Sequence, residues 1–344
     1  MNLHERPGVY TDLDLSTVWT GSKGSKTVAM AVQCDLEGLA SWSSAAEASV
    51  YLSGDALELA RLLFQNGAGS VMAYPVSAAT AAGYSAAASA LLAERKASYL
   101  ICDSTTAAIH AAIKTAVLAA ANEGNECIAL FGMGSSTVSD LTAAASALGS
   151  ERVVLVSGTA GLAGTESTGA IYGPAALAGL LARQTDPALP VNGVKLEGLA
   201  GVSQHFTETQ LDTLVQGGVT QLEDIGGEVS AVRAVTTRTQ TGGTPDASWR
   251  ELTTIMIVDE VIPALRNALK ARFLQKKNNE STRGAIRSLV AEELEKRVKR
   301  EIIDSYGDIH VEPDPEDPTM CQVSFSFAVA SGLNRIRLTA HITV

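Results

Sequence analysis

The sequence predicts a layered α/β body with a C-terminal α+β domain and extended N- and C-terminal β-strand arms. Three observations support this fold class. Short apolar runs alternate with alanine-rich helical stretches before residue 201, long helical patterns follow residue 249, and both termini alternate between apolar and polar residues. The domains expected are an N-terminal arm at 1–20, an alanine-rich α/β domain at 21–245, a C-terminal domain at 246–334 and a C-terminal arm strand at 335–344.

The first domain is predicted from the order of its elements. Alanine is the strongest bias, with 42 of the 53 alanines before residue 201. Alternation of strands with helices of 10–18 residues implies parallel pairing, and continuous apolar strands fit a sheet covered on both faces. The expected strands are 28–34, 70–76, 99–103, 127–133 and 153–157, and the expected helices are 57–65, 78–94, 106–123, 138–148 and 174–184.

The next section is mixed, with a strand expected at 229–235 and a turn-rich boundary at 239–248. A long helix is predicted from about Trp249 to Lys277, and Pro263 inside it should cause a kink. Another helix should start near Thr282, where apolar residues recur at four-residue spacing. These apolar residues are Ile286, Val290, Leu294, Val298 and Ile302.

Charge is distributed unevenly along the chain. The whole chain carries a net charge of −11, yet residues 264–300 contain eleven Lys or Arg against four Glu, a net charge of +7. Such a basic helical segment is either a solvated face or a surface that meets an acidic partner. The sequence alone leaves both interpretations open.

Both chain ends alternate as strands do. Residues 335–344 place Ile336, Leu338, Ala340, Ile342 and Val344 on one face, and residues 321–329 alternate equally well. Near the other end, Val9, Leu13 and Leu15 alternate with Tyr10, Asp12 and Asp14. A strand at the end of a chain needs a sheet, so the arms pair either within their own subunit or with a neighbouring subunit by β-augmentation.

Composition excludes several classes of protein. With 46% hydrophobic and 18% charged residues, the 344-residue chain is long enough to form a substantial core and is not a disordered polyelectrolyte. We expect no membrane span, no signal peptide and folding in a cytosol. An acidic net charge argues against a nucleic-acid-binding surface. Cys34, Cys102, Cys127 and Cys321 lack metal-ligand or disulfide spacing, and we expect buried reduced thiols.

No recognisable catalytic motif is present. Residues 132–136 (GMGSS) lie between a strand and a helix, where a phosphate-binding turn would sit, but they lack a dinucleotide fingerprint or a P-loop. We interpret them as a tight turn. None of the five histidines (His4, His110, His205, His310, His341) lies in a nucleophile motif. We therefore predict no catalytic, cofactor or metal site, and no enzyme.

Motifs in the two ends and the C-terminal third resemble those of contractile-tail sheath proteins of myophages and R-type bacteriocins. The resemblance rests on the order and spacing of these motifs rather than on one specific motif. In the alanine-rich middle of the chain, the predicted architecture is similar, more than the motifs are. The motifs are RPGVYT (6–11), VTTRT (235–239), WREL (249–252), FLQKKNN (273–279), PEDP (315–318) and GLNRI (332–336).

The resemblance implies a structural polymer without cofactors. Sheath subunits in this family form stacked hexameric rings around an inner tube, joined through their terminal arms, and they contract without nucleotide. By position, the helix that holds the sheath to the tube resembles residues 282–301, and its basic residues are then the expected tube-facing set. These are Arg283, Arg287, Lys296, Arg297, Lys299 and Arg300.

The implied partners are other copies of the chain, the inner tail tube protein, and baseplate and tail terminator proteins, with no nucleic acid and no membrane binding. Assembly is expected in the bacterial host cytoplasm, followed by release in a virion tail or tail-like particle. Two other classes remain open. A nucleotide- or small-molecule-binding α/β enzyme would gain thermal stability from its ligand. A non-contractile shell or surface-layer protein would assemble without forming a contractile tube.

Overall fold

A computed structural model describes residues 24, 26–135, 137–273, 275–317 and 319–334. Both predicted arms lie outside these residues, so their strand structure and their pairing stay predictions. The arm residues concerned are Val9, Tyr10, Leu13, Leu15, Ile336, Leu338, Ala340, Ile342 and Val344.

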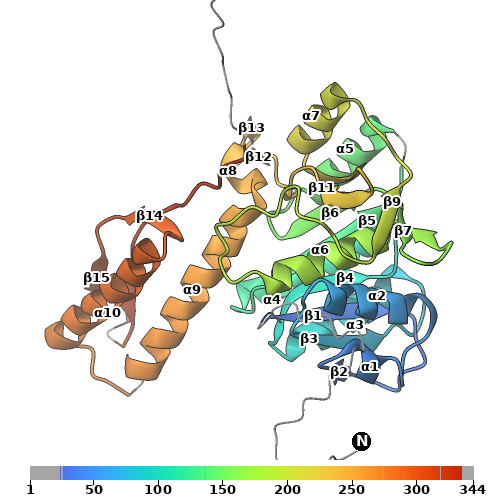
Figure 1. The fold of residues 1–344 in the computed structure, drawn as a ribbon. Helices are drawn as coiled ribbons and strands as arrows, with labels where there is room; N and C mark the ends of the chain where they lie inside the picture. The colour runs from blue at the N-terminus through green and yellow to red at the C-terminus, as the bar shows by residue number, and fades with distance from the viewer. Residues whose placement is uncertain (1–23, 25, 136, 274, 318, 335–344) are drawn as a thin grey trace, which may run out of the picture.

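An eight-stranded sheet forms the first part of the molecule, in the order β11-β10-β6-β5-β4-β1-β3-β2 (Figure 1). Its central strands pair in parallel, as the strand–helix alternation predicts, whereas the edge strands β2 and β11 are antiparallel to their neighbours. The strands are β1 (Thr27–Val32), β2 (Ala40–Trp42), β3 (Ser70–Pro75), β4 (Ala97–Cys102), β5 (Ile128–Met133), β6 (Val153–Ser157), β10 (Val219–Ile225) and β11 (Glu228–Ala231).

Helices cover both faces of this sheet, which explains why its strands are apolar throughout. In β1, Val28, Met30 and Val32 pack on the face covered by α2 and α6, and Ala29 and Ala31 pack on the opposite face. The first face is covered by α2 (Gly54–Gln65) and α6 (Tyr172–Arg183), and the second by α3 (Ala81–Ala93), α4 (Ala107–Asn122) and α5 (Val138–Leu148). The predicted covering on both faces is confirmed.

Smaller elements complete this body. A three-stranded sheet contains β7 (Ala160–Leu162), β8 (Thr168–Gly169) and β9 (Leu199–Val202), and the short helices are α1 (Ala45–Ala48) and α7 (Glu208–Gln216). The turn-rich boundary contains the hairpin of β12 (Gln240–Thr241) and β13 (Thr244–Pro245). Its turn residues Gly242 and Gly243 have φ of 59° and 82°, a conformation that glycine adopts readily.

The C-terminal part departs from the predicted elements in two ways. The helix expected at 249–277 is divided into α8 (Ala247–Arg250) and α9 (Leu252–Phe273), with extended backbone at Glu251. Helix α9 continues through Pro263 without interruption. The alternating run at 321–329 is two strands rather than one, and each has its own partner. Here α10 is Glu280–Lys299, β14 (Ile303–Tyr306) pairs with β17 (Phe327–Val329), and β15 (His310–Pro313) pairs with β16 (Cys321–Ser324).

Helix α9 connects two hydrophobic cores. Its first turns place Leu252, Ile255 and Met256 in the core beneath α2 and α6, whereas Val261 and Leu265 belong to the core around α10. Figure 1 shows the resulting arrangement, in which the orange and red C-terminal unit stands beside the α/β body and α9 lies between them. The two-domain division at 245/246 remains a prediction, because α9 belongs to both cores.

The cysteines are only partly as expected. All four are free thiols, and Cys102 and Cys127 are buried in the sheet core as predicted. Cys34 and Cys321 are only half-buried, because each lies near the end of a strand. Among the helices that the structure describes, none is long and apolar enough to cross a membrane.

Candidate functional site

The glycine-rich turn after β5 is explained by packing. A Cβ atom built on Gly132 would lie 2.1 Å from the backbone oxygen of Ala170, so a side chain cannot fit there without a shift of the backbone. At the start of α5, Thr137 accepts a hydrogen bond from the Asp140 backbone N–H at 3.2 Å, and Ser135 Oγ contacts the Asp140 carboxylate at 3.3 Å. That carboxylate lies in the first turn of α5, where a bound phosphate would be repelled by it.

Ligands of open α/β sheets bind outside the carboxyl ends of the strands at which the strand order reverses, which here are β1 and β4. Asp103 directly follows β4 and accepts hydrogen bonds from the Gln33 backbone N–H, at 2.7 Å, and from the Tyr84 hydroxyl. Burial raises the pKa of Tyr84, and the Asp103 hydrogen bond adds to the effect, so the phenol stays protonated and donating. Both oxygens of Asp103 therefore have partners within the protein.

His110 is a structural residue of the core. Its ring stacks on Phe131 at a centroid distance of 4.4 Å, and Nε2 lies 2.8 Å from the Ser104 backbone oxygen. Burial lowers the pKa of His110, which keeps the imidazole neutral. His205 and His310 are exposed, and His4 and His341 lie outside the described residues. Within the described part of the chain, no group of three or more His, Cys, Asp or Glu could hold a metal ion.

The basic residues predicted to face a tube differ strongly in their environments. In the last turns of α10, Lys296 pairs with Glu292 at 2.9 Å and with Glu293 at 2.8 Å, and Lys299 lies 3.8 Å from Glu295. The Arg297 side chain is only 8% exposed and contacts Glu293.

The hydrogen bond from Lys296, followed by that from Arg297, lowers the pKa of Glu293, so the pairs stay charged. Arg300, directly after α10, lies 3.5 Å from Glu260 of α9. Each of these four bases of the predicted set therefore has a carboxylate partner within the subunit.

The first half of α10 is different. Arg283 donates to the side chain of Asn278 at 3.1 Å, and Arg287 is exposed. Neither guanidinium forms an ion pair with a described carboxylate. The apolar side of the helix packs inward as predicted through Ile286, Val290 and Leu294, and Val298 contacts the same core. Of the predicted set, Arg283 and Arg287 thus keep a positive charge that no carboxylate of the described residues pairs with.

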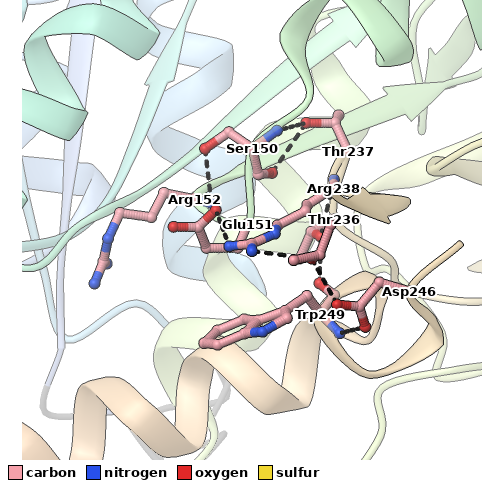
Figure 2. Close-up of polar contacts among 9 residues, drawn as sticks. Ser150, Glu151, Arg152, Thr236, Thr237, Arg238, Asp246 and Trp249 are labelled. Carbon is pink, nitrogen blue, oxygen red and sulfur yellow. Dashed lines mark hydrogen bonds and ion pairs between the residues drawn. The ribbon is translucent and has the colours of Figure 1, made fainter. Parts of the chain in front are cut away.

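The junction between the two units contains a polar network that joins Ser150 and Glu151 to residues 236–249 (Figure 2). Thr237 Oγ donates to the Ser150 backbone oxygen and accepts from the Ser150 N–H, both at 3.0 Å. Arg238 reaches Glu151 at 3.2 Å, and its guanidinium lies 5.0 Å from the centre of the Trp249 ring. Thr236 Oγ donates to the Trp249 backbone oxygen at 2.7 Å.

Asp246 caps α8 by accepting from the backbone N–H groups of Ser248 and Trp249. The motif residues of 235–239 and 249–252 thus hold the α/β body against the start of α9.

A second connection crosses this junction. The guanidinium of Arg152 forms two hydrogen bonds of 2.9 Å with the carboxylate of Asp259 on α9. The Arg152 side chain is 10% exposed and the Asp259 side chain 17%. Arg266, further along α9, contacts Glu126 at 2.6 Å. The sequence gives no signal for these pairs, because the partners are 107 and 140 residues apart.

The arm residues themselves are not described, but Gly24, near the N-terminal arm, and Asn334, next to the C-terminal arm, are. Gly24 donates its N–H to the Gly67 backbone oxygen at 2.9 Å. At the other end, Asn334 accepts a hydrogen bond of 2.7 Å from the Asn192 amide. Asn334 also reaches Glu251, at 3.5 Å, and Glu251 pairs with Arg233 at 2.6 Å. Gly24 and Asn334, the described residues nearest to the two arms, therefore have defined positions.

Two family matches cover most of this chain. Residues 77–237 match the phage tail sheath protein central domain, and residues 244–343 match the phage tail sheath C-terminal domain. The tail sheath protein of Bacillus phage SP01 is 28% identical over 135 residues, which are 39% of this chain and 23% of the phage protein.

Solved structures share the fold at low sequence identity. The sheath tail protein of Desulfitobacterium hafniense has a TM-score of 0.70 and 12% identity, over 94% of this chain and 100% of that chain. The sheath complex of the extracellular contractile injection system PVC, in its contracted state, has a TM-score of 0.72 and 14% identity, and the match covers 100% of this chain and 99% of that chain. A chain of the anti-feeding prophage baseplate has a TM-score of 0.74 and 16% identity, and the match covers 99% of this chain and 100% of that chain. The central-domain match lies in the α/β body, and the C-terminal-domain match lies in the C-terminal unit. The chain therefore belongs to the phage tail sheath family, a family of structural proteins.

Proposed function

We propose that this chain is the structural subunit of a contractile tail sheath. Copies polymerise as stacked hexameric rings around an inner tube, and contraction drives the tube through a target cell envelope. The observation that carries the proposal is the pair of sheath-family matches, over residues 77–237 and 244–343, on one chain whose two units are joined by α9. The same proposal places the assembled chain in a virion tail or tail-like particle, in contact with baseplate and terminator proteins.

Polymer formation is tested directly by electron microscopy of the purified chain. A sheath subunit should form hollow tubes of fixed width, since each copy offers the same contacts to the next. Monomers or small closed rings at all concentrations, with or without the tube protein, would contradict the proposal. An absolute requirement for ATP or a divalent metal during contraction would instead favour a nucleotide-dependent protein.

We further propose that the tube contact lies at the first half of α10. Arg283 and Arg287 are the two predicted tube-facing bases without an ion pair to a described carboxylate, whereas Lys296, Arg297, Lys299 and Arg300 are paired. A single exposed ion pair contributes only about 0–1 kcal/mol. The helical lattice repeats the contact at each subunit, so weak contacts add along the tail while each one breaks easily.

The double variant Arg283→Glu/Arg287→Glu tests this contact. It should keep the melting temperature of the subunit and reduce co-assembly with the tube, with free sheath appearing instead. Lys299→Glu is the matched control, because it reverses an exposed charge that is paired with Glu295 within α10. Higher salt should weaken wild-type attachment in the same direction. Extended tails at wild-type yield from the double variant would show that this face is only solvated.

A further inference from the structure

The described residues nearest to the two arms contact one short segment, residues 182–192, which we call the arm connector. It consists of the last two residues of α6 and the loop that follows. Its first residues contact Gly24, its middle contacts Gly332, and its last residue binds Asn334. Gly24 and Asn334 are more than 300 residues apart in sequence, and nothing in the amino-acid pattern indicates that they share a support.

The N-terminal contact is a close crossing of backbones. A Cβ atom built on Gly24 would lie 2.0 Å from the Ala182 backbone oxygen, and one built on Gly69 would lie 2.0 Å from the Gly24 backbone oxygen. The Arg183 side chain covers Gly67, whose φ is 105°. Gly24 is thus enclosed between the end of α6 and the turn before β3. Only a residue without a side chain fits this position.

The C-terminal contact uses both packing and hydrogen bonds. A Cβ atom built on Gly332 would lie 2.8 Å from Pro190, so the chain leading to the C-terminal arm passes directly over the connector. Two residues later, Asn334 accepts the 2.7 Å hydrogen bond from Asn192. Asn192 is itself fixed, because its side-chain oxygen accepts from the Ala234 N–H at 2.8 Å.

The connector is stiff for its length. Pro187 and Pro190 fix two of its φ angles, which lowers its freedom to change shape. The Asp186 carboxylate accepts from the Ala188 N–H at 2.9 Å, and the Gln184 amide donates to the Leu189 backbone oxygen. Val191 is buried in the core of the α/β body and Ala188 in the core around α10, so the loop is held at two further points, one in each unit.

We propose that the arm connector transmits force between the two arms of each sheath subunit. This inference rests on the proposed function, in which arms join neighbouring subunits. The connector gives a pull on one arm a path of about ten residues of stiff backbone to the other arm, beside the contacts of Gly24 with Gly67 and of Asn334 with Glu251. Gly24 and Asn334 then keep a constant relative position as the subunit rotates in the lattice.

The test loosens the connector without touching either arm. Pro187→Gly/Pro190→Gly restores backbone freedom at two positions, and Gln184→Ala is a milder variant that removes one hydrogen bond within the loop. Pro315→Gly is the control, because it frees a proline in an exposed loop outside the connector. Melting temperature, tube length and tube straightness are measured for the full chain, the last two by electron microscopy.

We expect both connector variants to give short or irregular tubes at near-wild-type melting temperature, and the control to match wild type. Wild-type tubes from both connector variants would overturn the inference while leaving the sheath function intact. Absence of tubes from the wild-type chain would instead count against the proposed function. If the proline variant melts early, Gln184→Ala decides the question, since unchanged tubes from it refute the proposal.

Discussion

The buried pair of Arg152 and Asp259 should be the most sensitive polar contact between the α/β body and α9. Asp259→Ala would leave the Arg152 guanidinium, 10% exposed, with only the Cys127 backbone oxygen at 3.5 Å as a described hydrogen-bond partner. Arginine cannot lose its charge at ordinary pH, so the cation stays buried without a hydrogen-bonded carboxylate, and only the electrostatic interactions with Glu151 and Glu126 remain to offset it. Removing one partner of such a pair typically lowers the free energy of unfolding by about 3–5 kcal/mol.

The opposite truncation should be milder. Arg152→Met leaves the Asp259 carboxylate, which can take up a proton and which lies near the positive charge of Lys26. We therefore expect the free energy of unfolding to fall less for Arg152→Met than for Asp259→Ala. The double variant Arg152→Met/Asp259→Ala should recover part of the loss, because neither charge remains. Glu58→Ala is the surface control: its partner Arg61 is 46% exposed, and the loss should be about 0–1 kcal/mol.

Urea unfolding of the four variants, followed by circular dichroism and by tryptophan fluorescence, measures these differences. Two probes are needed because α9 belongs to two cores, and a two-state analysis is valid only if the transitions coincide. The coupling free energy from the double-mutant cycle isolates the pair. A loss below about 1 kcal/mol for Asp259→Ala, with coupling near zero, would refute the role assigned to this pair.

Two further predictions concern the α/β body. Because burial lowers the pKa of His110 below its ordinary value of 6.5, the unfolded chain takes up a proton first as pH falls, and stability should decrease below pH 6.5 by up to about 1.4 kcal/mol per pH unit. His110→Gln should remove this part of the pH dependence of the melting temperature and His205→Gln should not; equal slopes in both would exclude the buried histidine as its source. Gly132→Ala should lower the free energy of unfolding by about 1–3 kcal/mol because its Cβ meets backbone, whereas Gly38→Ala, with open space around it, should change it by less than about 0.5 kcal/mol. A stable Gly132→Ala variant would show that packing does not require this glycine.

Elements with strong local signals were predictable to the residue. Strand β6 and helix α5 have the predicted bounds, 153–157 and 138–148. Helix α5 begins after Thr137, which caps it, and ends at Gly149, whose φ of 44° suits glycine. The short strands β14 and β15 were missed because half or more of their residues are exposed, so they lack a continuous apolar run.

The candidate site was less accessible to sequence reasoning. The cluster at Lys296, Arg297 and Lys299 looked like a basic surface, although glutamates three and four residues earlier indicate pairing along the helix. That local signal was available in the spacing. The contacts of Arg152 with Asp259 and of Asn192 with Asn334 were not, because only the folded backbone brings such distant residues together.

The continuity of α9 has a mechanical consequence. An α-helix rises 1.5 Å per residue, so the 22 residues from Leu252 to Phe273 form a rod about 33 Å long. The network around Thr237 and the Arg152–Asp259 pair fix the start of this rod to the α/β body, and the Arg266–Glu126 pair holds it to the same body further along. Only the seven residues after Arg266 extend beyond these pairs, a length of about 10 Å, so a rotation of about 10° there displaces the end of the helix by only about 2 Å. Since α10 packs on α9 in the second core, the surface on α10 is tied to the orientation of the α/β body and turns with it.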